Sequence, residues 1–258
     1  MTSNRALAFL FLVASCAGQP SPRHAVASTV GVVRSDDEAE AHRLATLLSS
    51  VAPRVARLLG VPNPPPVEVW QLSEEVNGPA EGRTTNGRIE IGEEVRGEEL
   101  WLIAHEYAHW CVANDPLKRW MGLPHLVLEG LAEFAAAYAL PCQAANAEAS
   151  QRELLESVEH IGSLDEVFAI GPREWGDIGN EQLLRTFYVV GFVLAARLGP
   201  DGLARSCAEA RISQNASAAG ALILCQAGMQ GASPEEWVVA LREAWETLHA
   251  SSLTSAGE

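Results

Sequence analysis

Two histidines and a glutamate near the middle of this 258-residue chain have a spacing that suits metal chemistry: His105, Glu106 and His109. The surrounding residues 99–113 include many apolar residues and good helix formers, without Gly or Pro, and predict a buried helix. Residues four apart lie on one face of a helix, so both imidazoles point the same way. At this spacing two neutral histidines bind a zinc ion while the intervening glutamate reaches a water beside it.

A catalytic zinc normally takes three protein ligands, so a third is expected elsewhere in the chain. The segment between Pro124 and Pro141 predicts a second helix, which carries Glu129 and Glu133 on one face. Two carboxylates on an otherwise apolar helix need a cation or hydrogen-bond donors if they are buried. We also expect Gly130 to let the backbones of the two helices approach closely.

This pattern, His-Glu-x-x-His followed about twenty residues later by Glu-Gly-Leu-Ala-Glu, resembles the gluzincin zinc metallopeptidases, especially the peptidase MA-like group related to thermolysin and aminopeptidase N. The resemblance covers residues 98–140. It implies one zinc ion, with Glu129 as the third ligand and Glu133 hydrogen-bonded to His105, which fixes the tautomer of that ring. The chain departs from the family where a Trp often precedes the Glu-Gly pair, because residues 126–128 are Leu-Val-Leu.

Two other residues compete with the glutamate helix for the third position. Asp115 lies six residues after His109, the offset used by metzincin-type enzymes, but those enzymes need a Gly where this chain has Val112. His125 lies one turn before Glu129 on the same face and can border the site.

Hydrolysis of an amide also calls for a hydrogen-bond donor to the oxyanion, which zinc neutralises only in part. Tyr107 and Tyr138 face away from the metal-binding faces of their helices. Residues 183–199 resemble the helix that packs over the metal in peptidase MA-like proteins, which leaves Tyr188 as the candidate catalytic donor and His160 as a weaker substitute.

The flanking segments predict an α+β, zincin-like fold: a small N-terminal sheet with helices, then the active-site helix, then a mainly helical C-terminal lobe. A helix is expected from about residue 37 to 59, capped by Asp36 and kinked or split at Pro53. Strands are expected at 27–33, 67–72 and 88–91, with a hairpin at Asn86-Gly87. Later helices are expected near 147–160, 180–198, 200–212, 216–228 and 234–249.

The hairpin strand has two interpretations. The segment 83–91 resembles in placement the edge strand that binds extended substrates in zincins, where main-chain pairing tolerates many sequences. It fits an interior strand equally well.

The N-terminus predicts export. Residues 1–16 combine one positive charge with a short apolar run, as in a signal peptide. Val13-Ala-Ser-Cys16 resembles the bacterial lipobox, which implies lipidation of Cys16 and an outer-membrane position if the host has such a membrane. The alternative is ordinary cleavage after Ala17 and secretion. The expected organisation is a signal at 1–16, a tether at 17–27, an N-terminal α/β part at 28–97, a helical part with the zinc site at 98–250 and a tail at 251–258.

Composition limits the partners. Lys and Arg number 18 against 33 Asp and Glu, so the net charge is −15, and loss of Arg5 with the signal makes it −16. Nucleic acid is therefore not expected as a partner, because phosphate contacts need clustered basic residues. A peptide or protein substrate is expected, with membrane contact through the lipid anchor only.

Four cysteines remain if Cys16 carries lipid, an even number that predicts two disulfides with three possible connectivities in an oxidising compartment. Of these we favour Cys111 with Cys142 and Cys207 with Cys225, which join the ends of neighbouring helices.

The sequence thus predicts a zinc-dependent metallopeptidase of the cell envelope, with Glu106 as the general base. The aminopeptidase N relatives bind a free amine through a Gly-x-Met-Glu-Asn segment, which this chain lacks, and this favours an endopeptidase. One alternative is a lipid-anchored binding or scaffold protein that keeps the zincin fold without turnover. Another is a closed structural zinc site with Asp115 or His125 as an added ligand.

Overall fold

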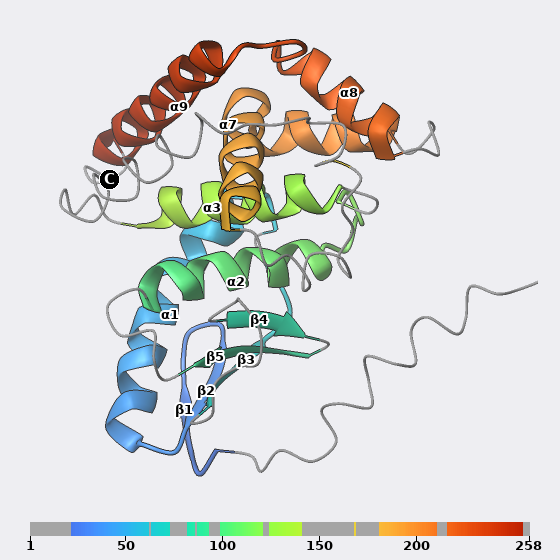
Figure 1. Cartoon of the computed structure of the whole chain (residues 1–258). Helices are drawn as coiled ribbons and strands as arrows, with labels where there is room; N and C mark the ends of the chain where they lie inside the picture. The colour runs from blue at the N-terminus through green and yellow to red at the C-terminus, as the bar shows by residue number, and fades with distance from the viewer. Residues whose placement is uncertain are drawn as a thin grey trace, which may run out of the picture.

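The protein is an α+β structure in which a small N-terminal sheet is followed by helices (Figure 1). The computed structural model describes residues 22–61, 63–72, 82–85, 87–92, 99–120, 124–140, 168, 181–210 and 216–254. The predicted signal peptide with Cys16 and the helix expected at 147–160 lie outside these residues. Among the helices that are described, none is both long enough and apolar enough to cross a bilayer.

Five strands form one mixed sheet, in the order β1-β2-β3-β5-β4. The central strands β2, β3 and β5 are parallel to one another. The edge strands β1 and β4 are antiparallel to their neighbours β2 and β5. The strands are β1 (His24–Ala27), β2 (Gly31–Ser35), β3 (Val67–Leu72), β4 (Gly82–Thr85) and β5 (Arg88–Gly92). The predicted strands at 67–72 and 88–91 and the hairpin between β4 and β5 are confirmed.

The first predicted strand and the tether need correction. The chain does not run straight from 27 to 33, because it turns after residue 27 and forms the antiparallel pair β1 and β2. The main-chain N–H of Ser28 donates to the oxygen of Gly31 over 2.8 Å, which closes this turn. Residues 24–27, which we expected in the tether, are therefore a strand of the sheet.

The two strands of the predicted hairpin occupy different positions in the sheet, because β4 lies at the edge and β5 in the interior. Within the described sheet, β4 pairs with β5 alone, and β5 is an interior strand paired with β3 on its other side. Thr84, Ile89 and Val69 share a row across the sheet. The two aliphatic residues of this row are completely buried, so the row faces the helices. Arg83, Arg88 and Glu90 lie on the opposite face.

Helix α1 (Glu38–Leu58) packs against α2 and the first strands. Its cap is Asp37 rather than Asp36, because the Asp37 carboxylate accepts from the main-chain N–H of Glu40 over 3.1 Å. Pro53 lies inside the helix without dividing it, and the apolar stripe on both sides of it is buried. Burial of this stripe offsets the loss of one main-chain hydrogen bond at the proline.

Three helices form successive layers above the sheet (Figure 1). Helix α2 (Glu99–Ala113) lies on the sheet and α1, α3 (His125–Ala139) packs on α2, and α7 (Glu181–Ala210) crosses α3. Helix α7 breaks at Gly199, where φ is 64°, just before Pro200, so the two helices predicted on either side of this point are confirmed. The helices α8 (Ala216–Gln226) and α9 (Pro234–Thr254) complete the fold. Because α9 continues to Thr254, residues 251–254, which we expected in the tail, are helical.

The predicted disulfides involve residues that the structure does not describe. Cys142 and the side chain of Cys207 lie outside the described part of the chain. Their expected partners Cys111 and Cys225 carry free thiols, the first buried and the second exposed.

Gly130 serves a different contact from the one we predicted. A Cβ built on Gly130 would lie 2.0 Å from Cα of Gly191, so the close approach is between α3 and α7, not between α3 and α2. A Cβ on Gly191 would in turn meet the main-chain oxygen of Leu126 at 2.5 Å. The two glycines thus allow α7 to cross α3 with its backbone almost in contact.

We predict that Gly191→Ala destabilises the protein by about 1–3 kcal/mol, because the added methyl must push α7 away from α3. The measurement is the free energy of unfolding in urea. Gly202→Ala is the control, in the part of α7 beyond its break, where the new Cβ would lie 3.4 Å from Cβ of Leu198, an ordinary contact. Equal effects of the two substitutions would show that the crossing does not depend on Gly191.

Candidate metal centre

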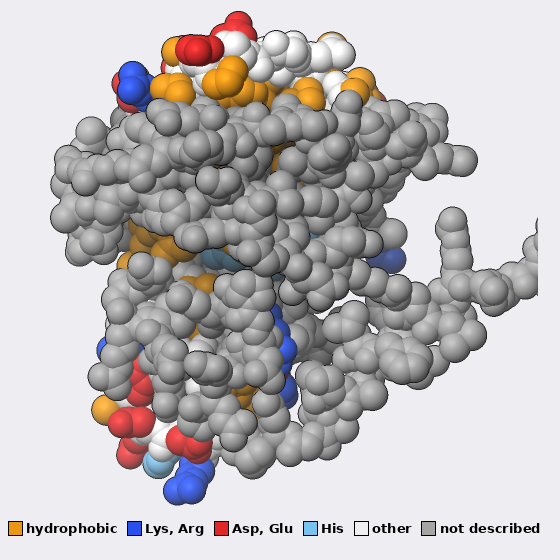
Figure 2. Space-filling view, in the orientation of Figure 1, with side chains coloured by type: hydrophobic (Ala, Val, Ile, Leu, Met, Phe, Trp, Pro, Cys, Tyr) orange, Lys and Arg blue, Asp and Glu red, His pale blue; other side chains and the backbone are white. Residues whose placement is uncertain are grey.

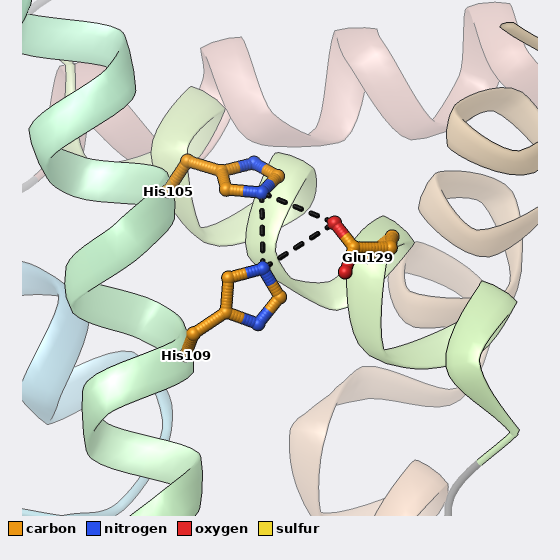
Figure 3. Close-up of side chains that lie close together, drawn as sticks. All are labelled: His105, His109 and Glu129. Atoms are coloured by element: carbon orange, nitrogen blue, oxygen red, sulfur yellow. Dashed lines mark hydrogen bonds and ion pairs between the residues drawn. The ribbon is translucent and has the colours of Figure 1, made fainter. Parts of the chain in front are cut away.

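Helices α2 and α3 bring three potential metal ligands together. The Nε2 atoms of His105 and His109 lie 3.0 Å apart, and each is 3.3 Å from Oε2 of Glu129. Figure 3 shows the two imidazoles projecting from one helix toward the carboxylate of the next. Within the described residues these are the His, Cys, Asp and Glu side chains that cluster closely enough to hold a metal ion.

The local sequence explains why the ligands point inward. The four-residue spacing places both histidines on the face of α2 that meets α3. These ligands are almost fully buried, since His105 is 6% exposed and Glu129 is 7% exposed. His109 keeps 13% of its side chain accessible. Histidine side chains are visible at mid-height of the molecule, between the sheet and the upper helices (Figure 2).

Glu133 lies behind the first histidine, where the family resemblance placed it. Its Oε1 is 2.9 Å from Nδ1 of His105, on the side of the ring away from Glu129. A proton on Nδ1 directed at this carboxylate leaves the Nε2 lone pair free to bind a metal ion. This contact therefore selects the tautomer that a metal site needs.

Glu106 contacts the edge strand β4, whereas the histidines on either side of it contact α3. Its side chain is 5% exposed and lies against the edge strand β4. There the hydroxyl of Thr84 is 2.7 Å from Oε2 of Glu106 and 2.9 Å from its main-chain oxygen. Sequence reasoning missed Thr84. The signal that could have found it is the Asn86-Gly87 turn, which sets the residues before it opposite residues 88–91.

The electrostatics of the centre favour a bound cation. Burial opposes charge on His105, yet the hydrogen bonds with Glu129 and Glu133 raise its pKa well above the usual value. Burial would also raise the pKa of Glu129, but the imidazoles of His109 and His105 reverse this effect and lower it well below the usual value. Three carboxylate groups, those of Glu106, Glu129 and Glu133, lie at or beside the imidazoles, and a divalent cation is a suitable partner for such a group.

The donor set fits zinc in chemistry and in spacing. Two imidazole nitrogens and one carboxylate oxygen are a known ligand set of catalytic zinc. Donors that lie 2.0–2.1 Å from a tetrahedral zinc are separated by about 3.3 Å. The three separations in this centre are 3.0, 3.3 and 3.3 Å, so the side chains are already arranged to hold such an ion.

Helix α7 brings Tyr188 close to the centre. Its ring centroid lies 6.3 Å from that of His105, with the rings at 80°. The crossing at Gly191, one turn further along α7, permits this approach. Burial, followed by the carboxylates of Glu133, Glu129 and Glu106, raises the pKa of Tyr188 above its usual value, so the hydroxyl keeps its proton.

Tyr107 and Tyr138 lie outside the centre, as the sequence predicted. Tyr107 is completely buried in the hydrophobic core, and Tyr138 is partly buried near the end of α3. His160 lies outside the described residues.

The two alternative third ligands make other contacts. Asp115 binds Arg119, and His125 lies near a different oxygen of Glu129 from the one that meets the imidazoles. The carboxylate of Asp115 accepts from the main-chain N–H of Arg119 at 2.9 Å and from its side-chain Nε at 3.0 Å. Arg119 also donates to the main-chain oxygen of Leu59, so this pair fastens the loop after α2 to the end of α1. His125 does border the site, but its Nε2 lies 3.4 Å from Oε1 of Glu129, not from the oxygen that meets the imidazoles.

Comparisons with protein families, with curated proteins and with solved structures find no match to this chain. The interpretation of the centre therefore depends on its own residues and their geometry.

We predict that Glu129→Ala weakens zinc binding more strongly than Glu133→Gln, because the first change removes a ligand and the second only the support of one. Loss of such support typically costs 10- to 100-fold in metal affinity. The measurement is a competition titration with a chromophoric chelator on chelator-treated protein. Wild-type affinity in Glu129→Ala would exclude this carboxylate as a ligand.

Proposed function

We propose that this protein is a zinc-dependent metallopeptidase of gluzincin type with a zincin-like fold. The observation that carries the proposal is the convergence of His105, His109 and Glu129 beside a buried glutamate that is not part of the ligand set. A purely structural zinc site has no need of this extra carboxylate, whereas hydrolysis needs a base next to the metal.

His105, His109 and Glu129 would hold one zinc ion, with Glu133 fixing the ring of His105. When bound, zinc supplies a Lewis acid that makes water more acidic and polarises the scissile carbonyl. Two rigid helices carry all four side chains, so their relative positions are set before the substrate arrives.

Glu106 acts as the general base in this proposal. It takes a proton from the attacking water and later delivers it to the leaving amine. Its position one residue after His105 turns it about 100° around α2, away from the face that meets α3 and toward β4. The carboxylate thus lies beside the ligands without competing for the metal.

Tyr188 is the proposed donor to the oxyanion. Its ring lies edge-on to that of His105, and the α3–α7 crossing holds it there. A protonated phenol in a nearly dry site is a stronger stabiliser of negative charge than the same group in water.

The substrate is proposed to be an extended stretch of polypeptide. The edge strand β4 lies next to Glu106, and its outer edge has main-chain groups that β5 does not use. A polypeptide that pairs with this edge is bound through its main chain, which suits cleavage within a chain. Together with the lipobox-like N-terminus, this makes the protein a candidate envelope endopeptidase.

We predict that Glu106→Gln retains one zinc per chain but lowers kcat by about 100- to 10,000-fold, the contribution of a general base. The measurement combines metal analysis with cleavage of casein and of a peptide library, with and without chelator. Glu99→Gln, a glutamate at the start of the same helix, is the matched control and should keep full activity.

Absence of chelator-sensitive cleavage by the zinc-loaded wild-type protein would contradict the proposal. That result would favour the alternative of a lipid-anchored binding or scaffold protein.

We also predict that Tyr188→Phe lowers kcat by about 100- to 1,000-fold, as loss of one oxyanion donor does elsewhere. KM and zinc content should change little, because the ring and its packing remain. Tyr138→Phe on α3 serves as the control, and full activity in Tyr188→Phe would move the oxyanion donor to another residue.

A further inference from the structure

The edge strand reaches the proposed general base through one side chain, that of Thr84. We propose that Thr84 is a positioning residue for Glu106, which holds its carboxylate in one orientation while the catalytic proton is exchanged. This inference rests on the proposed function. It assigns a role to a residue outside the motifs of the sequence.

The contact geometry identifies the acceptor. The Thr84 hydroxyl lies 2.7 Å from Oε2 of Glu106 and 2.9 Å from its main-chain oxygen, and it has one proton to donate. A carboxylate that acts as a base is the stronger acceptor of the two, so the proton is directed at Oε2. In a side chain that is 5% exposed, water does not readily replace this donor.

A hydroxyl donates one hydrogen bond and also accepts, so the contact persists when Glu106 takes up the catalytic proton. Before the transfer the Thr84 hydroxyl donates to Oε2. A proton that arrives on Oε2 is donated to the Thr84 oxygen, while the Thr84 hydroxyl donates to the main-chain oxygen of Glu106, 2.9 Å away. In the first step an O–H bond of water breaks as an O–H bond forms at the carboxylate. In the second step the same proton passes from the carboxylate to the leaving nitrogen, so Glu106 returns to its starting state.

Two contacts hold the strand that carries Thr84 in place. A Cβ on Gly82 would lie 2.8 Å from Cδ1 of Leu102, so the start of β4 presses directly on α2. On the other face of the strand, Arg83 pairs with Glu90, which is completely buried and lies directly across from it on β5. Because the strand is held on both faces, the hydroxyl of Thr84 has little freedom to leave Glu106.

The same arrangement connects substrate binding to the base. Thr84 lies in the strand to which an extended polypeptide would pair. Its side chain leaves the plane of the sheet and contacts Glu106. The strand that would bind the substrate therefore also holds the carboxylate that would act on it.

The test compares Thr84→Val, which removes the hydroxyl at nearly constant volume, with Thr84→Ser, which keeps it. In the zinc-loaded protein, Thr84→Val should lower kcat by about 10- to 100-fold, the range for loss of a hydrogen bond to a charged group, and leave KM within about twofold. Thr84→Ser should restore kcat to within about threefold of wild type. Thr46→Val, on the exposed side of α1, is the matched control and should not change either constant.

A second measurement is independent of activity. In chelator-treated protein, a double-mutant cycle of Thr84→Val and Glu106→Gln measures their coupling in the unfolding equilibrium constant. We expect a coupling of about tenfold, because the hydroxyl donates a stronger hydrogen bond to a carboxylate than to the amide that replaces it in Glu106→Gln. Additive effects, unchanged kcat in Thr84→Val, or failure of Thr84→Ser to restore kcat would each overturn the inference.

The two proposals fail in different ways. Wild-type protein that binds zinc and cleaves no peptide would overturn the proposed function and with it the catalytic role of Thr84. Active wild-type protein with an equally active Thr84→Val variant would overturn the inference alone.

Discussion

Glu129 is a buried carboxylate held 3.3 Å from each of two imidazole nitrogens, and this contact sets the conditions that the rest of the structure must meet. A buried charge without a partner costs several kcal/mol, so α2 and α3 must be held at one separation and one rotation. A displacement of about an ångström would leave the carboxylate without its imidazoles. The layers above and below these helices provide that constraint.

Helix α2 meets two different requirements on its two sides. Toward α3 it presents the histidines, and toward the sheet it presents Glu106, which finds the hydroxyl of Thr84. Both sides are buried, so each polar group on α2 needs a partner from another element. His105 finds one more in Glu133, and this fixes the ring from behind. The partners come from two separate parts of the chain, β4 and α3.

The outer layers fix these partners by packing and by charge. Above α3, the contact between Gly130 and Gly191 brings α7 close enough for Tyr188 to approach His105. On the outer face of the sheet, Arg83 and Arg88 both pair with the completely buried Glu90. Arg88 also lies 3.8 Å from the ring centroid of Trp70, a cation–π contact that adds to the attachment of the hairpin. The edge strand beside Glu106 is thereby held from its far side.

Local patterns were sufficient to predict much of this molecule. The four-residue spacing of His105 and His109 is a property of any α-helix, and the apolar stripes of the helices and the Asn86-Gly87 turn depend on neighbours along the chain. For the same reason the helix break near Gly199 was predicted, because a glycine followed by a proline disfavours a continuous helix wherever it occurs. These features need no knowledge of what packs against them.

The partners of the polar and small residues were decided by the tertiary structure alone. Gly130 approaches α7 and not α2, Asp115 binds Arg119, and Thr84 meets Glu106 across 22 residues of sequence. The chemistry of each residue suits several partners, and only the packing of the layers selects one. The sequence therefore determined which side chains were available for a metal centre, and the crossing of the helices over the sheet determined which of them meet, because contacts between distant segments depend on how whole elements bury their apolar faces.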